Sequence, residues 1–272
     1  MKPELHPSFP PASLRAALTA LAALAFAAQP APAAVTEAWV QRYSNVGDST
    51  DQASIVLRDA AGDFLVVGAT ADSFAVQGLL IIKYAGADGS VVWQKRHDGP
   101  AAILINRDPT GSYLAAVVDG SGNLVLTTRA DSDNPYGDYY TAKYAAADGA
   151  LLWERRYDGP AHGADIPWAV AVDGSGNVVV TGASQIGNDG IGFDYSYPSD
   201  FYTAKYAAAD GALLWEKRYD GPTNSHDFAS SVAVDAGGNV VVTGTSFNLL
   251  DDNGYDWYTA KYAAADGATI SV

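Results

Sequence analysis

One phrase of sequence returns four times along this chain and limits what the chain can fold into. The segments WVQRYSN, WQKRHDGP, WERRYDGP and WEKRYDGP begin at Trp39, Trp93, Trp153 and Trp215, so successive copies start 54 to 62 residues apart. Between them the same apolar phrases recur in the same order, as in VAVDGSGNVVVTG from Val170 and FYTAKYAAADGALLW from Phe201. Self-similarity at a fixed period indicates a tandem array of one structural unit.

Each complete copy predicts four short strands, which we call a, b, c and d. Strands a (AVAVD-like) and b (NVVVTG-like) are joined by a five-residue phrase such as Asp173 to Asn177, and Asp early with Gly late is typical of a tight hairpin. Strands c (FYTAKYA) and d (ALLWEKRY) are joined through Ala-Asp-Gly at 209–211. Four hairpin-linked strands in each repeat are typical of a β-propeller blade. The fold class we predict is all-β, a β-propeller of four recognisable four-stranded blades.

The predicted blades cover roughly residues 44–97, 98–157, 158–219 and 220–272, in a repeat domain over 35–272. The segment 37–43 (EAWVQRY) has the pattern of a lone outer strand and is suited to complete the last blade. The segment 268–272 (ATISV) begins an outer strand for the same blade, so two candidates compete for one position. Two arrangements stay open: a closed four-bladed ring, or part of a larger propeller with sheet edges exposed for pairing.

Residues 1–34 have the pattern of a secretory signal peptide. Lys2 and Arg15 precede a short apolar run at 16–28, and small residues with Pro follow at 29–34. Spanning a bilayer takes about 20 residues, so this run is too short for a membrane helix. We expect cleavage after Ala33 or Ala34 and an exported protein, periplasmic, extracellular or on the cell surface. We expect no transmembrane segment in the mature chain.

Charge and composition exclude several classes of function. Lys and Arg total 16 against 31 Asp and Glu, a net charge of −15 that repels phosphate backbones, so we expect no nucleic-acid partner. The chain has no cysteine, which excludes disulfides, thiol catalysis and Cys-ligated metal sites. It also carries no G-x-S-x-G elbow, no H-E-x-x-H pair and no phosphate-binding glycine loop. We therefore assign no catalytic residue.

The order of these phrases resembles a known family. VAVDGSGNVVVTG, followed by a DF-initiated strand and a DG-x-L-x-W strand, is similar to the bacterial β-propeller repeat called SBBP over residues 37–272. That resemblance implies an exported propeller, usually without an assigned activity. AAADGALLW is also similar to the PQQ-like tryptophan-docking repeat of quinoprotein dehydrogenases, Ala-x-Asp-x-x-Thr-Gly-x-x-x-Trp. With Gly149 and Trp153 aligned, this chain departs from that repeat: Lys143, Ala145 and Asp148 stand where it has Ala, Asp and Thr.

Loops that differ between the copies indicate where a site lies. The tight a–b and c–d turns fall at one end of each blade, the turn end, and the longer b–c and d–a connections fall at the other, the connection end. Segments with the same sequence in each copy, including the Asp-Gly-Pro corners, are assigned to the scaffold. Because variable loops on a rigid scaffold carry function, we place a ligand or partner face at the connection end. Its candidate residues are Tyr136, Asp138, His162, Asp165, Asp189, Asp194, Tyr195, Tyr197, His226, Asp227 and Tyr255.

Two of the b–c loops are loosely similar to calcium-binding loops. Their candidate ligands are Asp131, Asp133, Asp251, Asp252 and Asn253, hard oxygen donors of the kind that Ca²⁺ takes. Pro135 and Gly254 stand where a full calcium loop would place further ligands, so acidic turns without an ion are the alternative. Two His-Asp pairs in the d–a connections, at 162 and 165 and at 226 and 227, are a second possible metal or acid–base group.

The function we expect is that of a non-enzymatic binding or surface-interaction module. Its partner would be a protein or a glycan, contacted through the connection end, where tyrosines offer stacking or anchoring surfaces. One alternative is a propeller enzyme, either a quinoprotein-like oxidoreductase or a carbohydrate-active protein. Another is a purely structural or adhesive repeat, since one fold serves many functions.

Overall fold

The computed structural model describes residues 37–44, 51–71, 77–97, 113–130, 137–187, 197–248 and 254–270. The chain divides into two units, Met1–Val40 and Gln41–Val272, and the strands belong to the second. The predicted signal peptide, 1–34, lies outside the described residues. Residues 37–44 form no strand, and their role as an outer strand stays a prediction. Within the described ranges, no helix has the length and apolar character needed to cross a bilayer.

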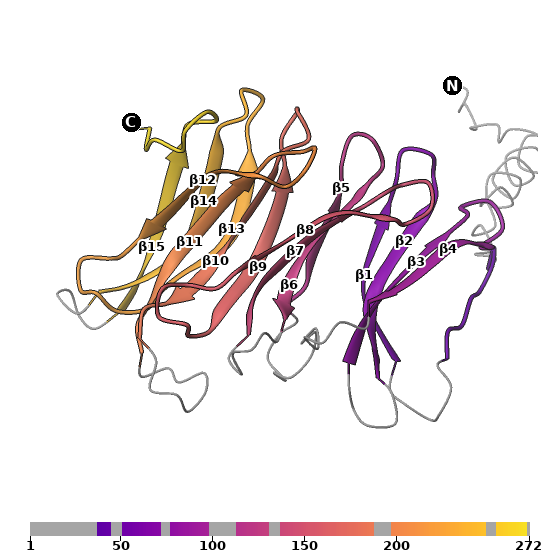
Figure 1. Cartoon of the computed structure of the whole chain (residues 1–272), viewed down its shortest axis with the longest axis horizontal. Helices are drawn as coiled ribbons and strands as arrows, with labels where there is room; N and C mark the ends of the chain where they lie inside the picture. The colour runs from indigo at the N-terminus through magenta and orange to yellow at the C-terminus, as the bar shows by residue number, and fades with distance from the viewer. Residues whose placement is uncertain are drawn as a thin grey trace, which may run out of the picture. The chain divides into compact units, whose positions relative to one another are not determined.

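The described residues form fifteen strands in four antiparallel sheets, which we call blades 1 to 4 (Figure 1). Blade 1 contains β1 (Asp51–Arg58), β2 (Phe64–Ala71), β3 (Gln77–Tyr84) and β4 (Val91–His97). Blade 2 contains β5 (Ala115–Val118), β6 (Leu124–Ala130), β7 (Asp138–Tyr144) and β8 (Leu151–Tyr157). Blade 3 contains β9 (Asp165–Val172), β10 (Val178–Gln185), β11 (Ser199–Tyr206) and β12 (Leu213–Tyr219). Blade 4 contains β13 (Asp227–Val234), β14 (Val240–Asn248) and β15 (Gly254–Tyr262).

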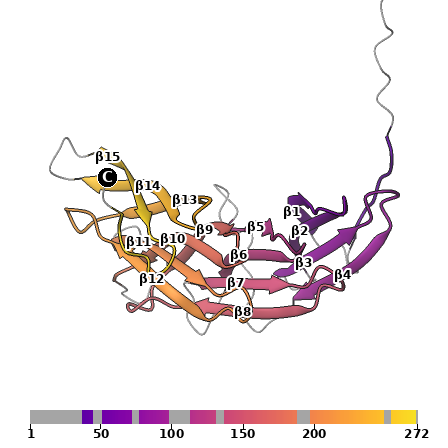
Figure 2. The ribbon, with the colours of Figure 1, turned by 90° about the horizontal axis from the view of Figure 1, so that it is seen from above.

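The strands of each blade pair in chain order, as four hairpin-linked strands require. In blade 4 the amide of Ile270 donates to the carbonyl of Lys261 at 2.8 Å, so a fourth strand starts to pair beside β15. Successive blades touch through their innermost strands: β1 with β5, β5 with β9, and β9 with β13. Figure 2 shows the blades following one another in chain order. The all-β prediction of four propeller blades is confirmed, while the closed ring and the larger propeller both stay predictions.

A tryptophan in each outer strand joins one blade to the next. Trp153 Nε1 of blade 2 donates to the carbonyl oxygen of Ala208 in blade 3 at 3.2 Å, and Lys143 Nζ donates to the same oxygen at 3.1 Å. Gly211 follows in that turn with a φ of 70°, and a Cβ there would lie 2.7 Å from the Trp153 ring. The equivalent Trp–carbonyl bonds join Trp93 to Ala146 and Trp215 to Ala264.

The turn end of each blade is closed by its own hydrogen bonds. Asp173 Oδ1 accepts from the amides of Ser175 and Asn177, both at 2.9 Å. Asp173 Oδ2 accepts from Asn177 Nδ2 and forms an ion pair with Lys205, again at 2.9 Å each. The matching Asp–Lys pairs of the other blades are Asp59–Lys83, Asp119–Lys143 and Asp235–Lys261. The predicted hairpin phrase therefore also neutralises a buried lysine.

One face of blade 4 is exposed where the matching face of the other blades is buried. Trp257 in β15 is 93% exposed, whereas Phe201, at the same position of β11, is 1% exposed. Phe201 packs edge-on against Tyr258 of the following blade, with ring centroids 5.4 Å apart. The exposed face of β15 therefore corresponds to the face of β11 that blade 4 covers.

Candidate functional site: two aspartate triads at the blade junctions

The structure describes seven of the residues predicted for the ligand or partner face. They are Asp138, His162, Asp165, Tyr197, His226, Asp227 and Tyr255. The other predicted residues lie outside the described residues: Tyr136, Asp189, Asp194 and Tyr195 of the face, and Asp131, Asp133, Asp251, Asp252 and Asn253 of the calcium loops. The predicted calcium loops therefore stay predictions.

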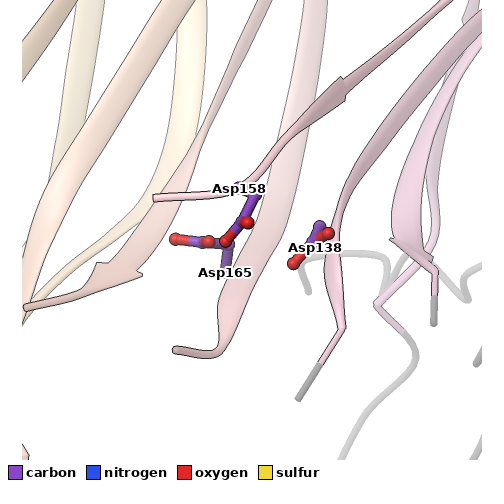
Figure 3. A group of neighbouring side chains, drawn as sticks. All are labelled: Asp138, Asp158 and Asp165. Carbon is purple, nitrogen blue, oxygen red and sulfur yellow. The ribbon is translucent and has the colours of Figure 1, made fainter. Parts of the chain in front are cut away.

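Three aspartates meet at the connection end between blades 2 and 3. Asp138 begins β7, Asp158 directly follows β8, and Asp165 begins β9. One carboxylate oxygen from each lies within 4.8 Å of the others. Figure 3 shows the Asp158 and Asp165 side chains close together, with Asp138 facing them from the neighbouring strand. We call this group the 2–3 triad.

The junction of blades 3 and 4 repeats this arrangement. Asp200 lies at the second position of β11, Asp220 directly follows β12, and Asp227 begins β13, again with oxygens within 4.8 Å. We call this group the 3–4 triad. In both triads the middle aspartate is exposed and the other two are buried.

Backbone hydrogen bonds explain why the buried aspartates are held here. The amide of Asp165 donates to the carbonyl of Gly137, which ties the start of β9 to the segment before β7, at 3.0 Å. Asp165 Oδ2 accepts from the amide of Gly159 at 2.6 Å, and Asp227 Oδ2 accepts from Gly221 at the same distance. A Cβ at Gly159 would lie only 2.8 Å from Asp165 Oδ1. Ser184 Oγ would lie closer still to that Cβ, so the Asp-Gly-Pro corner needs glycine because a serine hydroxyl and the carboxylate together occupy the space of a side chain.

Burial dominates the electrostatics of the triads. Burial raises the pKa of Asp165 from 3.8 to about 7. It also raises the pKa of Asp200 to about 6, although a hydrogen bond from Arg218 lowers it, and it raises the pKa of Asp227. The pKa of Asp165 is closer to neutral than that of Asp200, so the Asp165 carboxyl group carries a proton over the wider pH range of the two.

Arg218 connects the two junctions. Its Nη1 forms an ion pair with Asp200 Oδ2 at 3.1 Å, and its Nη2 donates to Ser184 Oγ at 2.6 Å and to the Tyr157 hydroxyl. Tyr157 of blade 2 stacks on Tyr202 of blade 3 with centroids 3.7 Å apart. Arg218 thus donates to Tyr157, which belongs to the aromatic stack between blades 2 and 3, and pairs with Asp200 of the 3–4 triad.

The structure does not bring the two predicted histidines together. His162 Nδ1 lies 2.6 Å from Asp158 Oδ2, and this hydrogen bond raises the pKa of His162. His162 has a φ of 50°, and its counterpart in the next connection is Asn224, with a φ of 47°. His226 instead stacks on Phe228, with centroids 5.7 Å apart. Among the described residues, the groups with metal-binding geometry consist of aspartates alone.

Two members of the 2–3 triad, Asp138 and Asp165, are among the residues predicted from the sequence, whereas the repetition of the Asp-Gly-Pro corner placed Asp158 in the scaffold. Asp220 and Asp200 of the 3–4 triad are likewise not among the predicted residues. A signal was present: an aspartate follows the corner aspartate seven residues later in both connections. Blade 1 differs, since Gly78 occupies the position of Asp138.

Likeness to solved structures is limited to the fold. An acylaminoacyl peptidase from Pyrococcus horikoshii is 10% identical with a TM-score of 0.48, over 82% of this chain and 32% of its own. Drosophila semaphorin 2a is 12% identical with a TM-score of 0.46, over 79% and 37%. A protein of unknown function from Dyadobacter fermentans is 12% identical with a TM-score of 0.45, over 79% and 67%. This chain thus spans well under half the length of the peptidase and the semaphorin.

A comparison with curated proteins finds no match. The family comparison is more specific, because residues 77–267, more than half of the chain, match a PQQ-like repeat family. The matched region runs from the third strand of blade 1 to the last turn of blade 4. The chain therefore belongs to the β-propeller family described as outer membrane protein assembly factor BamB.

Proposed function

We propose that this chain is an exported, non-enzymatic β-propeller that binds a partner protein through its connection end. The family description names an assembly factor, a role that is exercised by contact with other proteins, and this favours a protein over a glycan as partner. Export rests on the signal-peptide pattern of residues 1–34.

The observation that carries this proposal is the difference between the two ends of the blades. At the turn end the same aspartates and asparagines repeat and bond to one another. At the connection end the exposed groups differ from blade to blade. His162, whose side chain is 75% exposed, is replaced by Asn224 in the next connection, and Tyr255, 56% exposed, packs on Phe247 with centroids 4.9 Å apart. Recognition of one specific partner requires a surface of this varied kind.

Charge indicates the chemistry of that partner. Asp158 and Asp220 are exposed at the connection end, and the whole chain carries a net charge of −15. A basic patch on the partner would be steered towards this surface, and the association rate would fall as salt rises.

A pair of photo-crosslinking variants tests the proposal. One carries the crosslinker at position 162, at the connection end, and its matched control carries it at Ser175, in an exposed turn of blade 3. After irradiation in envelope preparations of the producing cells, we expect a discrete protein adduct from position 162 that weakens at high salt. Equal adducts from both positions, or adducts from position 175 alone, would contradict the proposal.

A further inference from the structure

The same buried oxygen makes no well-formed hydrogen bond at either blade junction, although a serine hydroxyl, that of Ser184 or Ser246, lies beside each aspartate. Asp165 and Asp227 are each 0% exposed, and within the described residues their Oδ1 atoms have no hydrogen-bond partner. In each case Oδ2 is satisfied by the glycine amide of the preceding corner. Leaving a buried acceptor unsatisfied is costly, and native proteins seldom do so without a ligand, a water or an ion. Its recurrence at equivalent positions indicates a feature of the repeat.

We propose that each junction triad binds one calcium ion, held by its three aspartates. The 2–3 triad would supply Asp138, Asp158 and Asp165, and the 3–4 triad would supply Asp200, Asp220 and Asp227. These sites are distinct from the predicted calcium loops. They share Asp158 and Asp220 with the proposed partner surface, but calcium binding is measured without any partner protein.

The spacing of the oxygens fits calcium. Two oxygens bound to one ion lie at most twice the metal–oxygen distance apart, which is about 5.2 Å for Ca²⁺ and about 4.2 Å for Mg²⁺. The triad oxygens lie within 4.8 Å of one another, an upper limit that one calcium ion can span. Three carboxylates at one site also favour Ca²⁺, because Mg²⁺ usually binds through one or two carboxylates and keeps several of its waters. Carboxylate oxygens are also the ligands that hard cations prefer.

The placement of the ligands gives an ion both an entry route and a structural role. Asp158 and Asp220 are exposed, so each site opens to solvent on one side while the other two ligands hold the buried side. Each ion would join the start of a c-strand, the end of a d-strand and the start of the next a-strand. It would therefore connect successive blades at the connection end, as the Trp–carbonyl bonds connect them at the turn end.

Calcium titration of the full chain tests the proposal. After EDTA treatment and desalting, we expect isothermal titration calorimetry with CaCl₂ to give two sites. At calcium about 100-fold above Kd, we expect Tm to rise by roughly 5 °C or more. Asp165→Asn and Asp227→Asn should each leave one site, and the double variant none. The matched control Asp148→Asn, in an exposed c–d turn, should keep both. No binding by the unsubstituted chain, or two sites in the double variant, would overturn the proposal.

Two further comparisons separate this assignment from its rivals. Asp131→Asn and Asp251→Asn alter the predicted calcium loops, and loss of binding there with retention in Asp165→Asn would overturn the triad sites. Asp158→Asn changes an exposed ligand and remains informative if the buried variant does not fold; we expect at least tenfold weaker binding at one site. MgCl₂ should bind at least tenfold more weakly than CaCl₂, and equal affinity would overturn the choice of calcium.

Discussion

The two ends of the blades use the same residue type with opposite electrostatic results. At the turn end burial would raise the pKa of Asp119 and Asp173, but hydrogen bonds from a lysine, an asparagine and backbone amides outweigh it and lower the pKa. At the connection end burial prevails, and the pKa of Asp165 rises to about 7. The two ends differ in both respects that set the sign. Asp173 pairs with Lys205 and accepts from Asn177 and two amides, whereas Asp165 is more deeply enclosed and, among the described residues, has no cation beside it to offset its burial.

The largest effect is expected at the turn end. Asp173→Asn leaves Lys205 buried without its counter-ion, and breaking a buried pair costs about 3–5 kcal/mol. Urea unfolding at pH 7 measures this loss. The control is Asp210→Asn, an exposed aspartate of the same blade that accepts from the Ala212 amide, where we expect a loss below about 1 kcal/mol. Equal losses in the two variants would show that the turn-end pair is not the stronger interaction.

The raised pKa of Asp165 at the connection end should make the free energy of unfolding depend on pH. Asp165 keeps its proton in the folded chain up to about pH 7 and loses it near 3.8 when unfolded, so its contribution is complete below pH 3.8 and is lost as pH rises to about 7. The difference of about three pKa units corresponds to a loss on the order of 4 kcal/mol. In calcium-free buffer, Asp165→Asn should flatten this part of the profile. A slope in the variant as steep as in the unsubstituted chain would refute the assignment.

Loss of the Trp–carbonyl hydrogen bond between blades should have an intermediate effect on the free energy of unfolding. Trp153→Phe removes the Nε1 donor to Ala208 and part of the ring volume while it keeps an aromatic side chain, so we expect a loss of about 1–2 kcal/mol in urea unfolding. Val92→Ala, an exposed position of an outer strand, serves as the control and should change stability by less than about 0.5 kcal/mol. If the Trp153→Phe variant were as stable as the control, the hydrogen bond from Trp153 to the Ala208 carbonyl would contribute nothing measurable to the free energy of unfolding.

The smallest effect concerns the exposed histidine. His162→Ala removes a hydrogen bond to Asp158 at a side chain that is mostly in solvent, where ion pairs contribute little. We expect the Tm at pH 8 to match that of the unsubstituted chain within error. A clear fall in Tm would assign His162 a structural role in the connection.

The blades could be predicted from the sequence because their strands and turns depend on residues that lie close together in the chain. A hairpin phrase such as 173–177 contains both the turn and the carboxylate that caps it, so neighbouring residues suffice to predict the structure. The triads draw on three elements from two blades, and only packing brings Asp138 next to Asp165. The exposure of Trp257 could not be predicted from the sequence either, since the residues around it match those around the buried Phe201. What repeats locally was predictable, and what depends on the next blade was not.

The shared carbonyl described above gives every blade a direction. Trp153 and Lys143 are donors on one side of blade 2, and Ala146 is the acceptor on its other side, where Trp93 of blade 1 donates. Such head-to-tail contacts are heterologous, so one subunit type can extend an array without limit unless the rotation between neighbours closes it. Duplication of a blade copies a matching donor side and acceptor side together, so an array of this kind can lengthen during evolution without inventing a new interface.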